Sequence, residues 1–291
     1  MSDSRIGNRP LPPTPSRRGE GGSVTDGSAQ APSPPVGEGW GGGAEQLHLI
    51  VPNWPAPATV RAVSTTRHGG ISPPPYDRLN LADHVGDDPA HVAENRRRLA
   101  AAVGLPGEPA WLEQVHGVEV VAAEKVCAPV AADAAWTREA GRPCVVMTAD
   151  CLPVLLCDRA GTVVAAAHGG WRGLAGGVIA ATVARLGVRP AELLAWLGPA
   201  IGPDAFEVGE EVRAAFLALD AGNAGCFRPS PAGRWLADIH ELARRQLRNL
   251  GVNEVYGGGW CTFSEPERFF SYRRENRTGR MATLIWLASG S

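Results

Sequence analysis

Short apolar runs, many rich in β-branched residues, follow one another along most of the chain. Runs of strand length predict β-strands at residues 47–52, 60–66, 111–115, 118–124, 143–149, 153–158, 162–168, 254–259 and 280–288. Apolar residues at helical spacing predict helices at 91–104, near 174–186 and at roughly 237–250. Strands that succeed one another through short turns, mixed with helices, indicate an α+β fold in which mixed and antiparallel β-sheets pack with helices as a single domain.

One predicted hairpin brings two reactive side chains to the same end of a sheet. Its turn is DRAG (158–161), whose first Asp and fourth Gly suit a type I turn with a glycine bulge. Pairing the strands across this turn places Cys151 and His168 opposite each other, or nearly so, at the open end. A slip of one residue would put the two side chains on opposite faces. Pro153 lacks a backbone N–H, which predicts that Cys151 lies just outside the regular sheet.

A third donor turns this pair into a candidate metal site. His116 lies in QVHG, between two predicted strands. Two histidines and one cysteine form a set of three ligands that leaves the fourth tetrahedral position open, as in catalytic zinc sites. The separations of these residues match no short motif, so only the fold could bring them together. The alternative is that Cys151 is a core residue and His168 bonds to backbone.

Composition separates an N-terminal segment from the rest of the chain. Residues 1–45 are rich in Pro, Gly and Ser and poor in large apolar side chains. Such a segment cannot bury enough surface to offset the entropy of ordering, so we expect a disordered tail at 1–45 and a folded domain at 46–291.

Charge and cysteine content narrow the class of protein. The 28 basic and 30 acidic residues leave a formal net charge of −2, which gives no footprint for nucleic acid or an anionic membrane. No apolar run approaches the roughly 20 residues that span a bilayer, and the first residues lack the apolar region of a secretory signal. The six cysteines form no CxxC pair, so reduced thiols are expected. We therefore expect a cytoplasmic protein. The oligomeric state is open, with a monomer as the working expectation.

The motifs of the chain resemble those of the laccase-domain family, whose members have been labelled polyphenol oxidases, peptidoglycan editing factors and purine nucleoside phosphorylases. The resemblance rests on QVHG, TADCLPVLLCD, AHGGWRG, GPAIGP and CTFSEPERFFSYRRENRTGRMATLIWL, supported by TTRHGGIS and LNLADHVGDD, and spans about residues 47–288. It implies that His116, Cys151 and His168 bind one zinc ion. It also implies phosphorolysis of adenosine, inosine and methylthioadenosine, with adenosine deamination as a second activity.

The chemistry of these reactions suggests further site residues. Zinc with an open position can lower the pKa of bound water to about 7. Asp150, next to Cys151, could carry the proton during deamination, or could instead cap a turn or orient a ligand histidine. Phosphorolysis needs a cation for the phosphate, and Arg172 is a candidate because it opens a predicted helix.

Substrate contacts are expected from three other motifs. The candidate cations are Arg67 in TTRHGG and Arg273, or its neighbour Arg274, in SYRRE, although each could equally form a surface ion pair. Asn80 in RLNLADH could contact sugar hydroxyls or only satisfy a turn. Nucleoside and phosphate would thus be the small-molecule partners.

Two other reaction classes and a non-enzymatic role compete with this hypothesis. Cys151 could be the nucleophile of a metal-free hydrolase, with a histidine as base, that cleaves an amide of a peptidoglycan precursor. Copper in place of zinc could give weak polyphenol oxidation. A true multicopper cluster needs many imidazoles, and the chain has seven histidines. Alternatively, a structural zinc could serve a protein that only binds partners.

Overall fold

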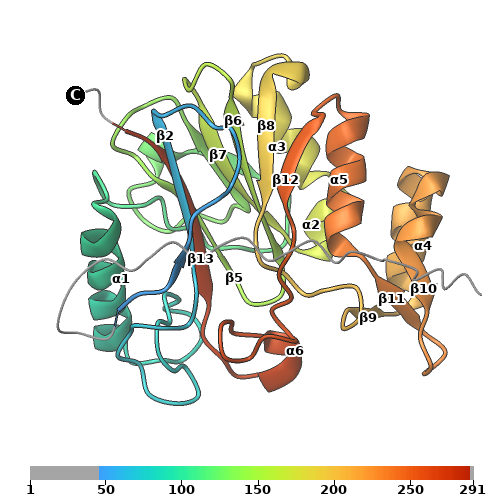
Figure 1. The fold of residues 1–291 in the computed structure, drawn as a ribbon, viewed down its shortest axis with the longest axis horizontal. Helices are drawn as coiled ribbons and strands as arrows, with labels where there is room; N and C mark the ends of the chain where they lie inside the picture. The colour runs from blue at the N-terminus through green and yellow to red at the C-terminus, as the bar shows by residue number, and fades with distance from the viewer. Residues whose placement is uncertain (1–45, 289–291) are drawn as a thin grey trace, which may run out of the picture. The chain divides into compact units, whose positions relative to one another are not determined.

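In this computed structural model, residues 46–288 are described, and their strands form three sheets (Figure 1). The segment predicted to be disordered, 1–45, and residues 289–291 lie outside the described part. The larger sheet has the order β12 (Glu254–Gly257), β8 (Leu193–Leu197), β6 (Leu152–Asp158), β7 (Val164–Gly169), β4 (Ala134–Thr137) and β3 (Val120–Ala122). The second has the order β1 (Leu49–Ile50), β2 (Val60–Thr65), β13 (Met281–Leu287) and β5 (Cys144–Thr148). A small sheet contains β10 (Phe227–Pro229), β11 (Trp235–Ala237) and β9 (Glu207–Val208).

Helices cover the outer faces of the two larger sheets. The α-helices are α1 (Pro89–Val103), α2 (Trp171–Gly176), α3 (Val178–Leu186), α4 (Glu210–Leu219), α5 (Ile239–Asn249) and α6 (Tyr272–Glu275), with 3₁₀ turns at Ala123–Lys125, Pro190–Glu192 and Ala221–Cys226. Leu99 of α1 packs with residues of β2, β5 and β13, whereas α3 and α5 pack on the six-stranded sheet. Figure 1 shows α1 on one side of the strands and α3 and α5 on the other.

The buried apolar residues form three clusters, and the central strands contribute to two of them because both of their faces are buried. Along β6, Val154 and Leu156 face the helices α3 and α5, whereas Leu155 and Cys157 face the four-stranded sheet. This two-sided burial explains why the strand reads as an almost continuous apolar run. Two pairs of strands, β3 with β4 and β8 with β12, are parallel and the other ladders are antiparallel. The predicted α+β class with mixed and antiparallel sheets is confirmed.

The β6–β7 hairpin has a different register from the predicted one. His168 pairs with Pro153, so Cys151 lies two residues beyond the partner of His168 and just before the first residue of β6. The turn is wider than DRAG alone, because the Asp158 carboxylate accepts N–H bonds from Thr162 and Val163. Cys151 still lies outside the ladder, as expected from Pro153.

Two predicted elements differ from the observed ones. The segment 111–115 is not a strand, because the side chain of Gln114 makes two hydrogen bonds with the backbone of Met147 in place of a ladder. The predicted helix near 174–186 is two helices, α2 and α3, separated at Gly177, whose φ of 98° is left-handed. The first of these helices begins only three residues after His168, so its start lies beside the site.

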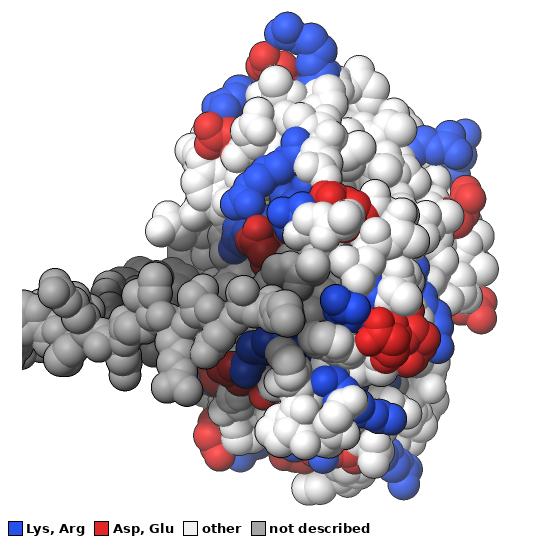
Figure 2. Space-filling view, turned by 90° about the vertical axis from the view of Figure 1, so that its right-hand side faces the viewer, with Lys and Arg blue, Asp and Glu red and all other residues white. Residues whose placement is uncertain are grey.

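Surface charge and helix length bear on the class of protein. On the face shown in Figure 2, basic and acidic side chains are interspersed, which agrees with the small net charge. Between residues 46 and 288, no helix is both long and apolar enough to span a membrane.

Candidate metal centre

His116, Cys151 and His168 converge in the structure. Their ligand atoms all lie within 4.8 Å of one another, and 3.7 Å separates Sγ of Cys151 from Nε2 of His116. Across the described residues, this is the one group of three or more His, Cys, Asp or Glu donors that is close enough to hold a metal ion. The fold thus brings together the three donors that the sequence singled out, and their binding of a metal stays a prediction.

The donor set fits a single tetrahedral ion. Zinc bonds of about 2.0–2.3 Å to nitrogen and sulfur place tetrahedral ligands roughly 3–4 Å apart, so small shifts would let the three atoms share one ion. His168 is buried, Cys151 is half-buried and His116 is exposed. The site therefore opens to solvent on the His116 side, where the fourth position would lie.

A buried carboxylate, Asp133, makes hydrogen bonds to both histidines. Nδ1 of His168 donates to Oδ1 of Asp133 at 2.7 Å, which leaves Nε2 directed to the site. The same carboxylate accepts the backbone N–H groups of Val115, His116 and Gly117. One side chain thus orients the buried ligand and fixes the loop that carries the exposed one.

Asp133 was not among the residues predicted from the sequence. Its signal is a single carboxylate inside the apolar run VAADAAW (130–136). A charged residue buried in such a run needs hydrogen-bond partners, and this expectation alone could have marked it as part of a polar site.

Two site residues have left-handed backbone conformations. His116 has a φ of 60° and Asp150 a φ of 92°. Residues other than glycine rarely adopt these angles, and the surrounding contacts must hold them there. For His116, the three N–H bonds to Asp133 provide that constraint. For Asp150, Thr262 and the backbone of Arg273 donate to the carboxylate at 2.7 Å each.

The second glycine of AHGGW gives the ligands room to approach. A Cβ atom on Gly170 would lie 2.6 Å from Cδ2 of His116 and 3.3 Å from Sγ of Cys151. The backbone of Gly170 has φ −64° and ψ 154°, which any residue can adopt. The requirement for glycine is therefore steric and comes from the two ligands.

The pKa values of Cys151 and His168 are both shifted toward the charged form of the side chain. Burial opposes ionisation of the thiol, but the charge of His168 and a hydrogen bond with His116 outweigh it and lower the pKa of Cys151 to about 6. Burial likewise disfavours the charged imidazole, yet the Cys151 charge and the hydrogen bond to Asp133 raise the pKa of His168 to about 9. A thiolate is the form of cysteine that binds metals, so the site has its sulfur ligand ready at neutral pH.

Asp150 connects three segments around the site. Its carboxylate binds Thr262 and the start of α6, and its backbone carbonyl accepts the N–H of Ile201. The carboxylate that orients a ligand histidine is Asp133, not Asp150. A role for Asp150 in proton transfer stays a prediction.

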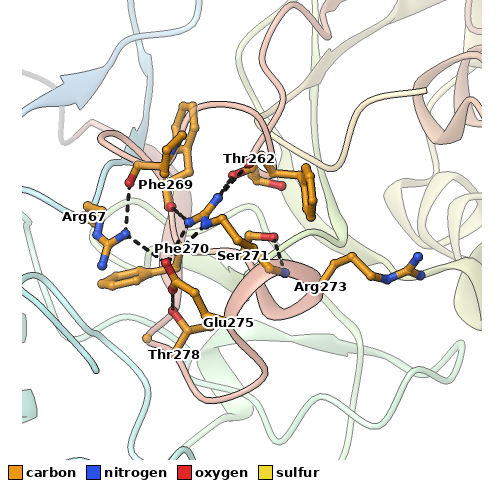
Figure 3. Close-up of polar contacts among 12 residues, drawn as sticks. Arg67, Thr262, Phe269, Phe270, Ser271, Arg273, Glu275 and Thr278 are labelled. Atoms are coloured by element: carbon orange, nitrogen blue, oxygen red, sulfur yellow. Dashed lines mark hydrogen bonds and ion pairs between the residues drawn. The ribbon is translucent and has the colours of Figure 1, made fainter. Parts of the chain in front are cut away.

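The predicted substrate contacts Arg67 and Asn80 are fully engaged within the protein. All three guanidinium nitrogens of Arg67 donate to protein oxygens, including Asp77 and Glu275. Figure 3 shows Arg67, Glu275 and Thr278 together in this cluster. Asn80 is buried, and its amide bonds to Ala82, Asp87 and Arg280. Contacts of either residue with a substrate stay predictions.

Arg172 and Arg273 are exposed cations. Arg172 is the second residue of α2 and lies over the ring of Trp171, at 4.6 Å from its centroid. Arg273 extends away from the Arg67 cluster (Figure 3), and its Nη1 donates to the carbonyl of Glu207 at 2.8 Å. The two side chains remain candidates for substrate binding.

The comparison with known proteins identifies the family. A family model described as "Multi-copper polyphenol oxidoreductase laccase" matches residues 61–288. The chain belongs to this family. The resemblance to the laccase-domain family noted from the motifs is thereby confirmed. A single three-donor group within residues 46–288 offers a site for one ion.

Relatives and solved structures agree with this assignment. "Purine nucleoside phosphorylase YfiH" of Escherichia coli (strain K12) is 57% identical over 240 residues, which cover 82% of this chain and 98% of that protein. "Purine nucleoside phosphorylase PA4543" of Pseudomonas aeruginosa is 59% identical over 239 residues, with the same coverage of both chains.

Two crystal structures have a similar fold. The protein NMB0706 of Neisseria meningitidis has a TM-score of 0.81 and 51% identity over 83% of this chain and 99% of its own. YlmD from Geobacillus stearothermophilus has a TM-score of 0.79 and 31% identity over 88% of this chain and 100% of its own.

Proposed function

We propose that this protein is a zinc-dependent purine nucleoside phosphorylase that acts on adenosine, inosine and methylthioadenosine and also deaminates adenosine. The observation that carries the proposal is the open three-donor site formed by His116, Cys151 and His168. Relatives at 57–59% identity that are named purine nucleoside phosphorylases support the substrate class. Zinc is preferred to copper because two imidazoles, one thiolate and an open position are typical of catalytic zinc, although copper could bind the same donors.

Phosphorolysis exchanges one bond at the sugar. A phosphate oxygen forms a bond to C1′ while the bond between C1′ and the purine nitrogen breaks, and its electron pair leaves with the purine. Hydrogen phosphate brings the proton that the purine gains, so free base and pentose 1-phosphate are the products. In deamination, water replaces the amino group at C6 of adenosine and ammonia leaves.

Different residues would bind the zinc ion, the phosphate and the nucleoside and hold them in position. A zinc ion, when bound, supplies a Lewis acid that stabilises negative charge on oxygen. Asp133 keeps His168 in the tautomer that can bind metal and fixes the His116 loop. In the proposal, Arg172 and Arg273 supply cations for the phosphate, Arg67 and Asn80 line the substrate path, and Asp150 carries a proton during deamination.

A second candidate function rests on the Cys151 thiol. A thiolate next to two histidines is also the arrangement of a cysteine hydrolase, which would cleave an amide of a peptidoglycan precursor. Such an enzyme needs no metal. Full activity in chelator, together with loss of activity on thiol alkylation, would favour it over the phosphorylase.

The deciding experiment incubates zinc-loaded protein with adenosine, with and without phosphate, and separates the products by chromatography. We expect adenine only when phosphate is present, inosine from deamination without phosphate, and inosine together with its phosphorolysis product hypoxanthine with phosphate. Cys151→Ser and His168→Ala should lose both zinc and activity, whereas retained zinc in both would contradict the ligand assignment. No conversion by a zinc-loaded sample would refute the proposal.

We place this enzyme in the cytosol as part of the proposal. All six cysteines are free thiols, and Cys151 must stay reduced to bind metal. A monomer is the simplest assembly, since the three donors come from one chain.

A further inference from the structure

One arginine that sequence reasoning did not select, Arg280, lies at the start of β13 beside the metal centre. Met281, the residue after Arg280, pairs with Thr148 across β13 and β5, and Thr148 lies three residues before Cys151. The backbone of Arg280 is held on its other side by Asn80, whose Oδ1 accepts its N–H at 3.0 Å. Its bonds to Asn80 and to the N–H of Leu81, together with the pairing of Met281, fix where the side chain of Arg280 starts.

The Nε–Nη2 edge of the Arg280 guanidinium is available to bind a ligand. Its Nη1 donates to the carbonyls of Thr278 and Gly279, at 2.9 and 3.0 Å. Within residues 46–288, no protein group accepts a hydrogen bond from its Nε or Nη2. The side chain is half-buried, and its carbon Cζ lies 5.7 Å from the ring centroid of Tyr272. An arginine with a free Nε–Nη2 edge presents the two parallel N–H donors that match a phosphate.

Negative charges at the candidate metal centre act on the guanidinium of Arg280. Burial lowers the pKa of Arg280, and the negative charges of Cys151 and Asp150 act in the opposite direction. Both groups therefore lie within electrostatic reach of the cation. The adjacent Tyr272 is exposed and belongs to α6, which Asp150 anchors through the N–H of Arg273.

The other arginines near the site are less suited to hold an anion there. Arg67 and Arg274 have all their guanidinium nitrogens bonded to protein oxygens. Arg172 and Arg273 are exposed, and one nitrogen of Arg273 is held by Glu207. Arg280 combines partial burial, a fixed backbone, a free edge and closeness to Cys151.

We propose that Arg280 binds the phosphate of the phosphorolysis reaction through its free Nε–Nη2 edge, and that Asn80 acts as a positioning residue that holds its backbone. This inference rests on the proposed function, because phosphate is the substrate that the reaction adds. It gives buried Asn80 a role other than direct substrate contact. It adds Arg280, at the start of β13, to Arg172 and Arg273 as a cation for the phosphate.

The test measures phosphate binding separately from turnover. Zinc-loaded wild-type protein, Arg280→Gln, Arg280→Lys and the control Arg185→Gln, an exposed arginine of α3, are titrated with inorganic phosphate by calorimetry, and the KM for phosphate and for adenosine is measured for each. Zinc content and the unfolding midpoint show whether each variant is folded and loaded.

For Arg280→Gln we expect at least a tenfold higher phosphate Kd and KM, with adenosine KM and zinc content near the wild-type values. Arg280→Lys should recover only part of the loss, because an ammonium keeps the charge but not the two parallel donors. Unchanged phosphate binding in Arg280→Gln, or in Arg280→Lys if the first variant does not fold, refutes the assignment. So does an equal rise of both KM values.

The two proposals fail in different ways in this experiment. Wild-type protein that binds phosphate in an Arg280-dependent way but converts no nucleoside refutes only the proposed function. Phosphate-dependent conversion that does not depend on Arg280 refutes only the present inference.

Discussion

Oδ1 of Asp133 lies 2.7 Å from Nδ1 of His168, and the same carboxylate accepts the N–H of His116 at 2.9 Å. Both candidate histidine ligands therefore depend on one buried side chain that is not itself one of the three donors. Burial disfavours the charged form of Asp133, but the hydrogen bonds from His168 and Gly117 outweigh it and lower its pKa. The carboxylate thus remains an acceptor for both histidine segments.

Asp133→Asn should weaken zinc binding by roughly 10–100-fold, because the amide cannot accept every hydrogen bond that the carboxylate accepts. Competition with a chromogenic chelator measures the affinity. The matched control is Asp158→Asn, a buried carboxylate in the turn at the other end of the β6–β7 hairpin. This control should lose stability and keep its zinc affinity. Equal zinc affinity of Asp133→Asn and the wild type would contradict the role of Asp133.

Gly170→Ala should prevent the two ligands from sharing an ion, because the added Cβ would lie 2.6 Å from Cδ2 of His116. The protein should fold, since the backbone angles of Gly170 suit alanine. Zinc content, measured by mass spectrometry of the metal, should drop well below one ion per chain. Gly225→Ala is the control, because a Cβ there meets no atom within 4 Å. Full zinc content in Gly170→Ala would show that the site tolerates the methyl group.

Cys151 should be alkylated in chelator-treated protein with a rate that rises around pH 6, following its lowered pKa. Iodoacetamide labelling followed by peptide mass spectrometry measures the rate at each pH. Cys157 serves as an internal control, since burial raises its pKa to about 12 and it should stay unmodified. Added zinc should protect Cys151. Labelling that zinc does not slow would argue against Cys151 as a ligand.

His240 should make the fold less stable at mildly acidic pH. It is buried, donates to the carbonyl of Gly198, and burial lowers its pKa below the ordinary value of 6.5. The unfolded chain then binds the proton first as the pH falls, so stability is complete above about 6.5 and decreases below it. His240→Asn should show a smaller loss of the urea midpoint between about pH 7 and pH 5.5. Parallel curves for both proteins would exclude His240 as the titrating group.

The sequence pointed to the three candidate donors more readily than to the groups that support them. His116, Cys151 and His168 could be named because their side chains are chemically distinctive. Their convergence depends on pairings over long separations, such as β13 with β5, which local periodicity does not reveal. Arg280 was not selected for the same reason, because its surroundings come from distant segments, whereas Asp133 has a local signal as the one carboxylate in the apolar run 130–136.

Local signals also explain the errors in the predicted elements. The strand predicted at 111–115 failed because Gln114 replaces ladder bonds with side-chain bonds. The strand β8 was missed although LLAWL is an apolar run, and α4 was missed between the short strand β9 and the 3₁₀ turn at Ala221–Cys226. The hairpin turn was recognised, but the extra bonds to Asp158 shifted its register.

The position of β13 between β2 and β5 has a consequence for how the protein is made. Residues 60–65 and 144–148 are synthesised long before residues 281–287, and neither strand has its main partner until then. The four-stranded sheet can therefore close only after residue 287 has emerged from the ribosome. Arg280 also joins the ligands at that late step. A nascent chain could thus hold the three donors in place while still lacking the cation beside them, and catalytic competence would begin with the insertion of one strand.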